Sequence, residues 1–302
     1  MQLNRSRSEA RRAYLLLALP PLVIYLGVTA YPAIFSVVLS LTNYDGGRIF
    51  GGDPLEFVGL RHYMRMFRDP YFWISLKNNL YIVAISVFGQ IPLGFIIAYA
   101  LYRKLVVARD FFQTVIYLPA VISTIVIGIL WQAFFSPYGA FTAIVRYFDP
   151  NWINMIFLNP RYAIAAVLFV ILWMYTGIYM IIFLANLQKI SPEMIEAAKI
   201  DGAKESQIAR HVIIPSLSGV FVTTSILAIS GSLKSFDLIF AMTAGNPARR
   251  TSVLALYMYD SAFRGAADFP RANAISTVMI VVSLVLIAVV RLIARRFGGS
   301  EE

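Results

Sequence analysis

Few residues in this chain have the types and spacing that acid–base, metal or phosphate chemistry needs. The 302 residues contain no cysteine and two histidines, His62 and His211, which do not stand at a metal-ligand spacing. The sequence also lacks Gly-x-x-x-x-Gly-Lys-Ser/Thr, which binds nucleotide phosphates, and Gly-x-Ser-x-Gly, which carries a nucleophilic serine. We therefore expect no metal, no cofactor and no catalytic residue here. Work against a gradient then requires energy from another subunit.

The composition is typical of a protein that lies in a membrane. Hydrophobic residues make up 59% of the chain and charged residues 14%, and the mean hydropathy is +0.70. A soluble domain has roughly 25% charged residues, so this chain has too few to cover a surface that faces water. The net charge of +10 indicates loops facing anionic lipid. We therefore expect the lipid bilayer, and no nucleic acid, as a partner.

Six stretches without Asp, Glu, Lys or Arg are long enough to cross a bilayer, which takes roughly 20 helical residues. They are residues 13–44, 78–102, 111–145, 162–188, 211–233 and 272–290. The third should hold one span, from about Thr114 to Phe135, followed by a short re-entrant or surface piece at 136–139. The sequence thus predicts an all-α, polytopic membrane protein with six transmembrane helices.

Arginines flank both ends of this set of spans. Those before the first and after the last stretch are Arg5, Arg7, Arg11, Arg12, Arg291, Arg295 and Arg296. Basic residues at span ends favour the cytoplasmic side, so both termini are predicted to be cytoplasmic. No charged residue lies at the centre of any stretch. Because intramembrane charges usually mark ion paths and proton relays, their absence argues against an ion pump and leaves neutral solutes open.

The loop 188–211, between the fourth and fifth spans, has the pattern of a helical hairpin. Ser191 is a suitable N-cap, with proline at the next position, and Gly202 is a natural end for a helix of about ten residues. A second helix is expected from about Ala203 into the fifth span. Ile195 and Ala198 place an apolar patch on one face of the first helix. By itself this pattern fits a solvated hairpin and a docking helix equally well.

The same loop resembles the EAA loop of ABC importer permeases. That pattern is Glu-Ala-Ala, three residues, Gly, nine residues, Ile, one residue and Leu-Pro. The matching positions here are Glu196, Ala197, Ala198, Gly202, Val212, Ile214 and Pro215. Two of them depart from the pattern, each aliphatic for aliphatic. In that family the loop forms a coupling helix that sits in a groove of the ATPase subunit, so the resemblance implies this role for the Glu196–Gly202 segment.

The resemblance extends over nearly the whole chain. Segments similar to sugar-type permeases are 57–63, 69–73, 78–79, 117–119, 136–139, 236–240 and 243–247. The family usually has Asn at His62, Thr at Asn79 and Gly at Asn246. The likeness is to the "first" permeases of maltose, lactose and glycerol-3-phosphate systems, and it implies a type I importer permease for a sugar or polyol-like solute.

The same resemblance implies partners and a location. The partners are a second permease subunit, two ATPase subunits that bind the ATP, and an extracytoplasmic solute-binding protein. The location is the cytoplasmic (inner) membrane of a bacterium or archaeon. The chain would divide into 1–74, with the N-terminal tail, first span and first external loop, and 75–302, a five-helix core with the coupling loop.

Two sets of residues are candidates for the solute pathway. A possible gate or external loop contains Phe236, Asp237, Thr243, Gly245 and Pro247. Possible solute-facing aromatics are Trp131, Trp173, Tyr175 and Tyr179.

Two other classes of function compete with this interpretation. One is a stand-alone secondary transporter or channel for a neutral solute. The other is a membrane enzyme, for which the external carboxylate pairs Asp53 with Glu56 and Asp260 with Asp268 would have to act without a neighbouring histidine.

Overall fold

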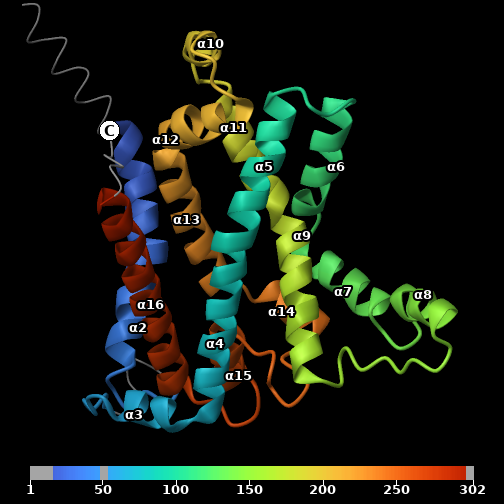
Figure 1. The fold of residues 1–302 in the computed structure, drawn as a ribbon. Coiled ribbons are helices and arrows are strands. Elements are labelled where there is room, and N and C mark those ends of the chain that lie inside the picture. The colour runs from blue at the N-terminus through green and yellow to red at the C-terminus, as the bar shows by residue number, and fades with distance from the viewer. Residues whose placement is uncertain (1–15, 48–53, 297–302) are drawn as a thin grey trace, which may run out of the picture. The chain divides into compact units, whose positions relative to one another are not determined.

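The regular structure of the chain is helical. The computed structural model describes residues 16–47 and 54–296, and within these ranges the extended backbone forms one isolated bridge, between Thr42 and Phe57 (Figure 1). The elements in chain order are η1 Leu26–Ala30, α2 Tyr31–Leu39, α3 Arg61–Arg68, α4 Pro70–Ile85, η2 Ser86–Gln90, α5 Ile91–Tyr102, α6 Arg109–Val121, α7 Thr124–Phe134, α8 Ala140–Phe148, α9 Pro160–Leu187, α10 Pro192–Ile200, α11 Glu205–Ile208, η3 Ala209–Ile213, α12 Ile214–Ser216, α13 Ser218–Leu233, α14 Asp237–Met242, α15 Leu254–Phe263 and α16 Phe269–Arg296. The predicted all-α class is confirmed.

Four helical segments are long and apolar enough to cross a membrane. They are Leu16–Leu39, Pro70–Tyr102, Pro160–Leu187 and Phe269–Arg295. Two bent helix pairs raise the number to six if each pair forms one span. Each of the six apolar stretches therefore has a helical counterpart. The N-terminal arginines Arg5, Arg7, Arg11 and Arg12, together with Asp53, lie outside the described residues.

Prolines within the long helices are accommodated by widened turns. Pro32, Pro92 and Pro215 each follow a π-helical turn that ends two residues earlier. A proline lacks an N–H and crowds the carbonyl four residues before it, so an ordinary α-turn is strained at that point. The π-turn shifts the pairing by one residue, as in the bond from the N–H of Ile91 to the carbonyl of Ser86. The helices therefore continue through these prolines.

Two predicted spans are not continuous helices. The expected span from Thr114 to Phe135 is broken, because α6 ends at Val121, Ile122 is extended, and α7 leaves at an angle of 98°. Pro119 near the end of α6 removes a helical hydrogen bond there. The helix expected from Ala203 into the fifth span bends by 68° at Leu217, two residues after Pro215. Each bent pair can still form one span, and the bends themselves were not predicted from the sequence.

The chain forms two compact units by its internal contacts. One comprises residues 1–68 and 258–278, and the other residues 69–257 and 279–302. In the first unit, Ser36 donates a hydrogen bond to the side chain of Asn273 at 2.7 Å, joining α2 to α16. His62, which is buried, lies 3.0 Å from the carbonyl of Thr42 through Nε2. The division at residue 74 expected from the sequence stays a prediction of domain organisation.

In the second unit, α9 is the most buried of the candidate spans, and α5 and α6 pack against it (Figure 1). Glycines let the backbones meet closely. A Cβ on Gly94 of α5 would lie 2.7 Å from Cβ of Tyr179, and one on Gly177 of α9 would lie 2.4 Å from the carbonyl oxygen of Ile116.

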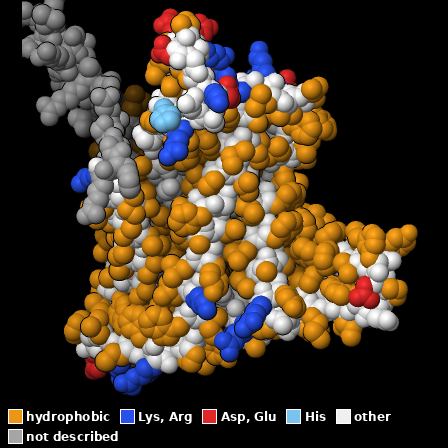
Figure 2. All heavy atoms as spheres, viewed as in Figure 1, with side chains coloured by type: hydrophobic (Ala, Val, Ile, Leu, Met, Phe, Trp, Pro, Cys, Tyr) orange, Lys and Arg blue, Asp and Glu red, His pale blue; other side chains and the backbone are white. Residues whose placement is uncertain are grey.

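Hydrophobic side chains cover α4, α5 and α9 on the visible face, whereas charged side chains gather around α10 (Figure 2).

Three buried side-chain amides hydrogen-bond to backbone groups of distant segments. Asn79 donates to the carbonyl of Ser232 and accepts from the N–H of Leu254, both at 2.8 Å. Its neighbour Asn78 donates to two further carbonyls, and Gln90 donates to the carbonyl of Ile171 at 2.6 Å. These contacts join segments that are 81 to 175 residues apart.

We expect Gly177→Ala to destabilise the protein by about 1–3 kcal/mol, because the added methyl group must separate α6 from α9. Thermal unfolding of the detergent-purified protein measures the effect. Gly219→Ala is the control, since nothing lies within 4 Å of its Cβ position, and its melting temperature should stay the same or rise. Equal melting temperatures for the two variants would contradict the close contact.

Candidate coupling hairpin and solute cavity

The hairpin expected at 188–211 is present and projects beyond the ends of α5 and α9 (Figure 1). Its first helix, α10, runs from Pro192 to Ile200, and Ser191 occupies the N-cap position without a side-chain cap bond. The chain turns at Gly202, whose φ of +80° lies in the left-handed region that residues with a Cβ avoid. The helix end expected at Gly202 is thus where the structure has it.

One face of α10 is attached to the core of the second unit. The side chain of Ile195 is only 4% exposed and packs with Leu187 and Ile208, and Ala198 packs against the same cluster. The apolar patch of Ile195 and Ala198 is therefore used inside the protein. It is not available to a partner, contrary to what the helical spacing alone allowed.

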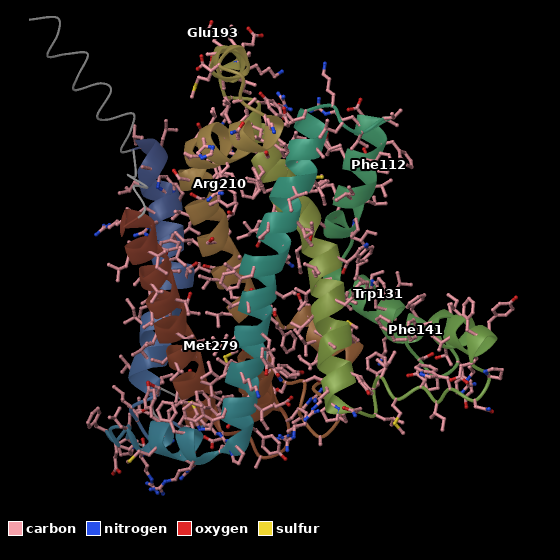
Figure 3. The ribbon with its side chains drawn as sticks, viewed as in Figure 1. Phe112, Trp131, Phe141, Glu193, Arg210 and Met279 are labelled. Atoms are coloured by element: carbon pink, nitrogen blue, oxygen red, sulfur yellow. The ribbon has the colours of Figure 1, made fainter. Side chains whose placement is uncertain are left out.

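The opposite face of α10 is exposed. Its accessible side chains are Glu193, Met194, Glu196, Ala197 and Ile200. Figure 3 shows Glu193 at the tip of the hairpin, pointing away from the bundle. Ile200 is 86% exposed, which is unusual for an aliphatic residue beside a buried cluster. This face combines carboxylates with small and apolar side chains.

A charged pair fixes the second half of the hairpin to α5. Arg103, just after α5, forms a two-pronged interaction with Glu205 at the start of α11, with Nη2 donating to Oε2 at 2.6 Å. Tyr99 donates to the same carboxylate. Hydrogen bonding to Glu205 raises the pKa of Arg103, which keeps the pair charged. No local sequence pattern indicates this pair, because its members are 102 residues apart.

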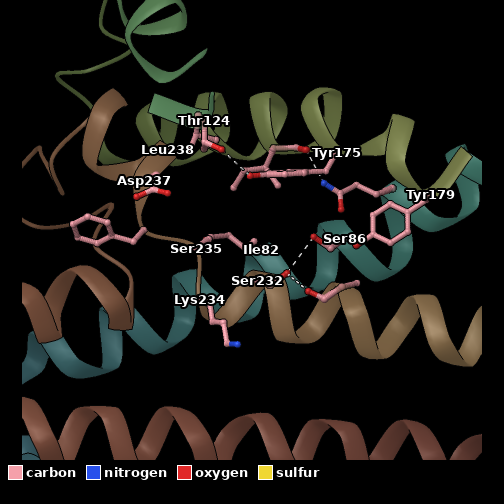
Figure 4. Close-up of a pocket in the computed structure, with 15 residues that line it drawn as sticks. Ile82, Ser86, Thr124, Tyr175, Tyr179, Ser232, Lys234, Ser235, Asp237 and Leu238 are labelled. Atoms are coloured by element: carbon pink, nitrogen blue, oxygen red, sulfur yellow. Dashed lines mark hydrogen bonds between the residues drawn. The ribbon is translucent and has the colours of Figure 1, made fainter. Parts of the chain in front are cut away.

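A cavity of about 200 Å³ lies between α4, α7, α9, α13 and α14 (Figure 4). One buried water needs about 10–15 Å³ by a comparable measure, so there is room for a small solute. Two of the predicted solute-facing aromatics, Tyr175 and Tyr179, line it, as do Phe236 and Asp237 from the predicted gate. Residues from distant parts of the sequence thus meet at one site.

The polar wall of this cavity was missed by the sequence analysis. Ser232 donates to Ser86 at 3.2 Å, and Gln90 lines the cavity one helical turn after Ser86. The hydroxyls of Thr124 and Tyr175 lie 3.5 Å apart. Hydroxyl and amide residues four positions apart in an apolar stretch, Ser86 and Gln90, are the sequence signal for this wall, because that spacing places both on one face of a helix.

The other candidate pathway residues lie away from this cavity. Thr243 and Gly245 are buried in a turn after α14, where the N–H of Gly245 donates to Oγ1 of Thr243 at 3.2 Å. Pro247 follows a cis bond in the same segment. Trp131 and Trp173 pack together with ring centroids 5.3 Å apart, and neither lines the cavity.

No cluster of three metal-ligating side chains is found among residues 16–47 and 54–296.

Comparison with known proteins agrees with this architecture. Residues 90–299 match the family described as binding-protein-dependent transport system inner membrane component. The lactose transport system permease protein LacF of Rhizobium radiobacter is 32% identical over 93% of this chain and 95% of its own length. A probable ABC transporter permease protein of Pyrococcus horikoshii is 31% identical over 91% of this chain and 93% of its own.

A solved structure shares the fold. A bacterial alginate ABC transporter, in complex with an alginate pentasaccharide-bound periplasmic protein, has a chain that matches with a TM-score of 0.81 and 21% identity, over 98% of this chain and 99% of that one. The chain described here belongs to the binding-protein-dependent transport system inner membrane component family. It is a multi-pass membrane permease of the ABC importer type, with a type I permease fold.

We expect Ile195→Asp to loosen the hairpin, because it places a carboxylate in the apolar cluster that holds α10. Hydrogen exchange in 190–204 should become at least tenfold faster. The matched control is Ile200→Asp, the same substitution at an exposed position of the same helix, which should leave exchange unchanged. Similar exchange in both variants would show that Ile195 does not anchor the helix.

Proposed function

We propose that this chain imports a sugar or polyol-like solute as one of two permease subunits, driven by a separate ATPase pair that docks on the exposed face of α10. The observation that carries the proposal is the hairpin itself. It projects from the core, offers Glu196 and Ala197 outward, and is held from behind by Ile195 and the Arg103–Glu205 pair. A helix held in this way moves as a rigid body with the spans.

The proposed docking surface on α10 fixes the orientation of the chain in the membrane. The α10 end faces the cytoplasm, where ATP is available, and the arginines at the outer span ends predict a cytoplasmic location for both termini as well. The chain sits in the cytoplasmic membrane of a bacterium or archaeon. At the opposite end of the second unit, the exposed residues of the segment 246–250 face the solute-binding protein. The solved alginate transporter is in complex with a periplasmic protein, which supports a solute-binding protein as a partner.

The cavity is the proposed solute site. Sugar rings have apolar faces that favour aromatic surfaces, and Tyr175 and Tyr179 offer such surfaces. Hydroxyl and amide groups of Ser86, Gln90 and Ser232 suit the hydroxyls of a neutral solute. Lys234 extends away from both tyrosines (Figure 4). The lactose permease relative supports a sugar as the solute class.

Transport then depends on moving the cavity walls. The walls come from α4, α7, α9, α13 and α14, and two of these helices follow a sharp bend. A displacement of the hairpin by the ATPase reaches α13 through α11 and α12, and reaches α5 through Arg103. We propose that this opens the cavity to one side of the membrane and then to the other.

Glu196→Arg should abolish docking of the ATPase, since it reverses the charge at the centre of the exposed face. We expect at least tenfold less ATPase to co-purify with the variant from membranes that contain the ATPase and companion permease encoded beside this chain. Gly202→Pro should act in the same direction, because proline cannot adopt a φ of +80°.

The control for docking is Glu56→Arg, an exposed carboxylate outside the hairpin with the same charge reversal. It should retain the ATPase. If the correctly inserted Glu196→Arg variant also retains the ATPase, α10 is not the docking site.

The solute site has a separate test. Tyr175→Ala and Tyr179→Ala remove aromatic surface from the cavity, so we expect the KM for sugar uptake into proteoliposomes to rise roughly tenfold, while the amount of bound ATPase stays unchanged. Trp173→Ala is the control, because that ring does not line the cavity. An unchanged KM in both tyrosine variants would move the solute site elsewhere.

A further inference from the structure

The turn Pro247–Arg250 holds two adjacent arginines in an unusual backbone. The N–H of Arg250 donates to the carbonyl of Pro247 at 2.9 Å, and the two residues between them, Ala248 and Arg249, have φ values of 51° and 59°. These values define a turn of the I′ kind, which glycine and asparagine normally occupy. Left-handed backbone is unfavourable for residues with a Cβ, so the surrounding contacts must hold the turn in place.

Those contacts come from buried polar groups. Asn78 of α4 donates to the carbonyls of Arg250 and Ser252, each at 2.8 Å. Thr251 donates through Oγ1 to the carbonyl of Asn246 at 2.8 Å and pairs with Thr243 at the same distance. The turn is thus rigidly attached to a candidate span.

Neither arginine side chain is held by an acidic side chain in the described part of the chain. Both are exposed, and neither guanidinium has a carboxylate within salt-bridge distance among the described residues. Arg249 lies 5.3 Å over the ring of Tyr71, which orients its side chain. An ordered turn therefore presents two guanidinium groups to the surroundings. Such groups bind carboxylates in a two-pronged geometry.

The residue that holds this turn is next in sequence to a residue that holds the cavity wall. Asn78 holds the turn, and the next residue, Asn79, holds the carbonyl of Ser232 at 2.8 Å. Ser232 lines the cavity and donates to Ser86 on its other wall. Two consecutive residues of α4 thus connect the exposed arginines with the proposed solute site.

We propose that Arg249 and Arg250 form a carboxylate-recognition turn for an acidic patch on the solute-binding protein, and that Asn78 and Asn79 link its occupancy to the cavity wall. The inference rests on the proposed function, because it requires the turn to lie outside the cell. A protein partner fits better than lipid phosphate, since the turn is held in one conformation and joined to the cavity by residues that a peripheral lipid contact does not need.

The test uses the complete transporter in proteoliposomes with the solute-binding protein encoded next to this permease. ATP hydrolysis is measured as a function of the concentration of that binding protein, loaded with solute. For Arg249→Glu with Arg250→Glu, we expect the half-stimulating concentration to rise at least tenfold while the rate at saturation stays close to that of the unaltered protein. Arg249→Lys with Arg250→Lys should restore only part of the affinity, because lysine keeps the positive charge but lacks the two-pronged geometry.

Arg161→Glu serves as the control, since Arg161 is an exposed arginine at the start of α9 with the same charge reversal. It should leave the half-stimulating concentration unchanged. If the half-stimulating concentration is unchanged in the Arg249→Glu, Arg250→Glu variant, the turn does not recognise the binding protein. The same conclusion follows if only the ATPase rate at saturation falls. In both cases the proposed function still stands. If the binding protein fails to stimulate even the unaltered transporter, the proposed function fails, and this inference fails with it.

Discussion

The pairing of backbone polar groups in apolar surroundings is the constraint on which the other features of this protein depend. Lipid offers no hydrogen bonds, so each N–H or carbonyl freed inside the membrane needs a partner from the protein. The π-turns before Pro32, Pro92 and Pro215 meet this need locally. Where the chain breaks more sharply, the amides of Asn78 and Asn79 supply the missing partners from another helix.

This constraint also explains how the segments on either side of a bend remain attached. Bends of 98° and 68° interrupt two spans, and the elements on either side are held by specific polar bonds and by glycine contacts rather than by continuous helix. Packing through Gly94 and Gly177 brings α5 and α6 close to α9. The result is a set of stiff segments joined at defined points, which is the arrangement that alternating access requires.

The hairpin and the cavity differ in how they use charge. The Arg103–Glu205 pair lies at the edge of the protein, where a two-pronged ion pair can hold orientation at little desolvation cost. The cavity instead has hydroxyl and amide groups, whose burial is tolerated because Ser232 and Gln90 are hydrogen-bonded. An ion pair thus holds the hairpin in place, whereas the wall formed by Ser86, Gln90 and Ser232 is neutral, with Asp237 and Lys234 also lining the cavity.

The sequence by itself determined the all-α class, the six apolar stretches and the hairpin with its end at Gly202, because hydropathy and helix-end preferences act locally. It also indicated the family through the spacing from Glu196 to Pro215. The tertiary structure alone decided that Ile195 faces the core, that Tyr175 and not Trp173 lines the cavity, and that Arg103 meets Glu205. These facts depend on how the helices rotate and cross, and that is set by packing between residues far apart in the chain.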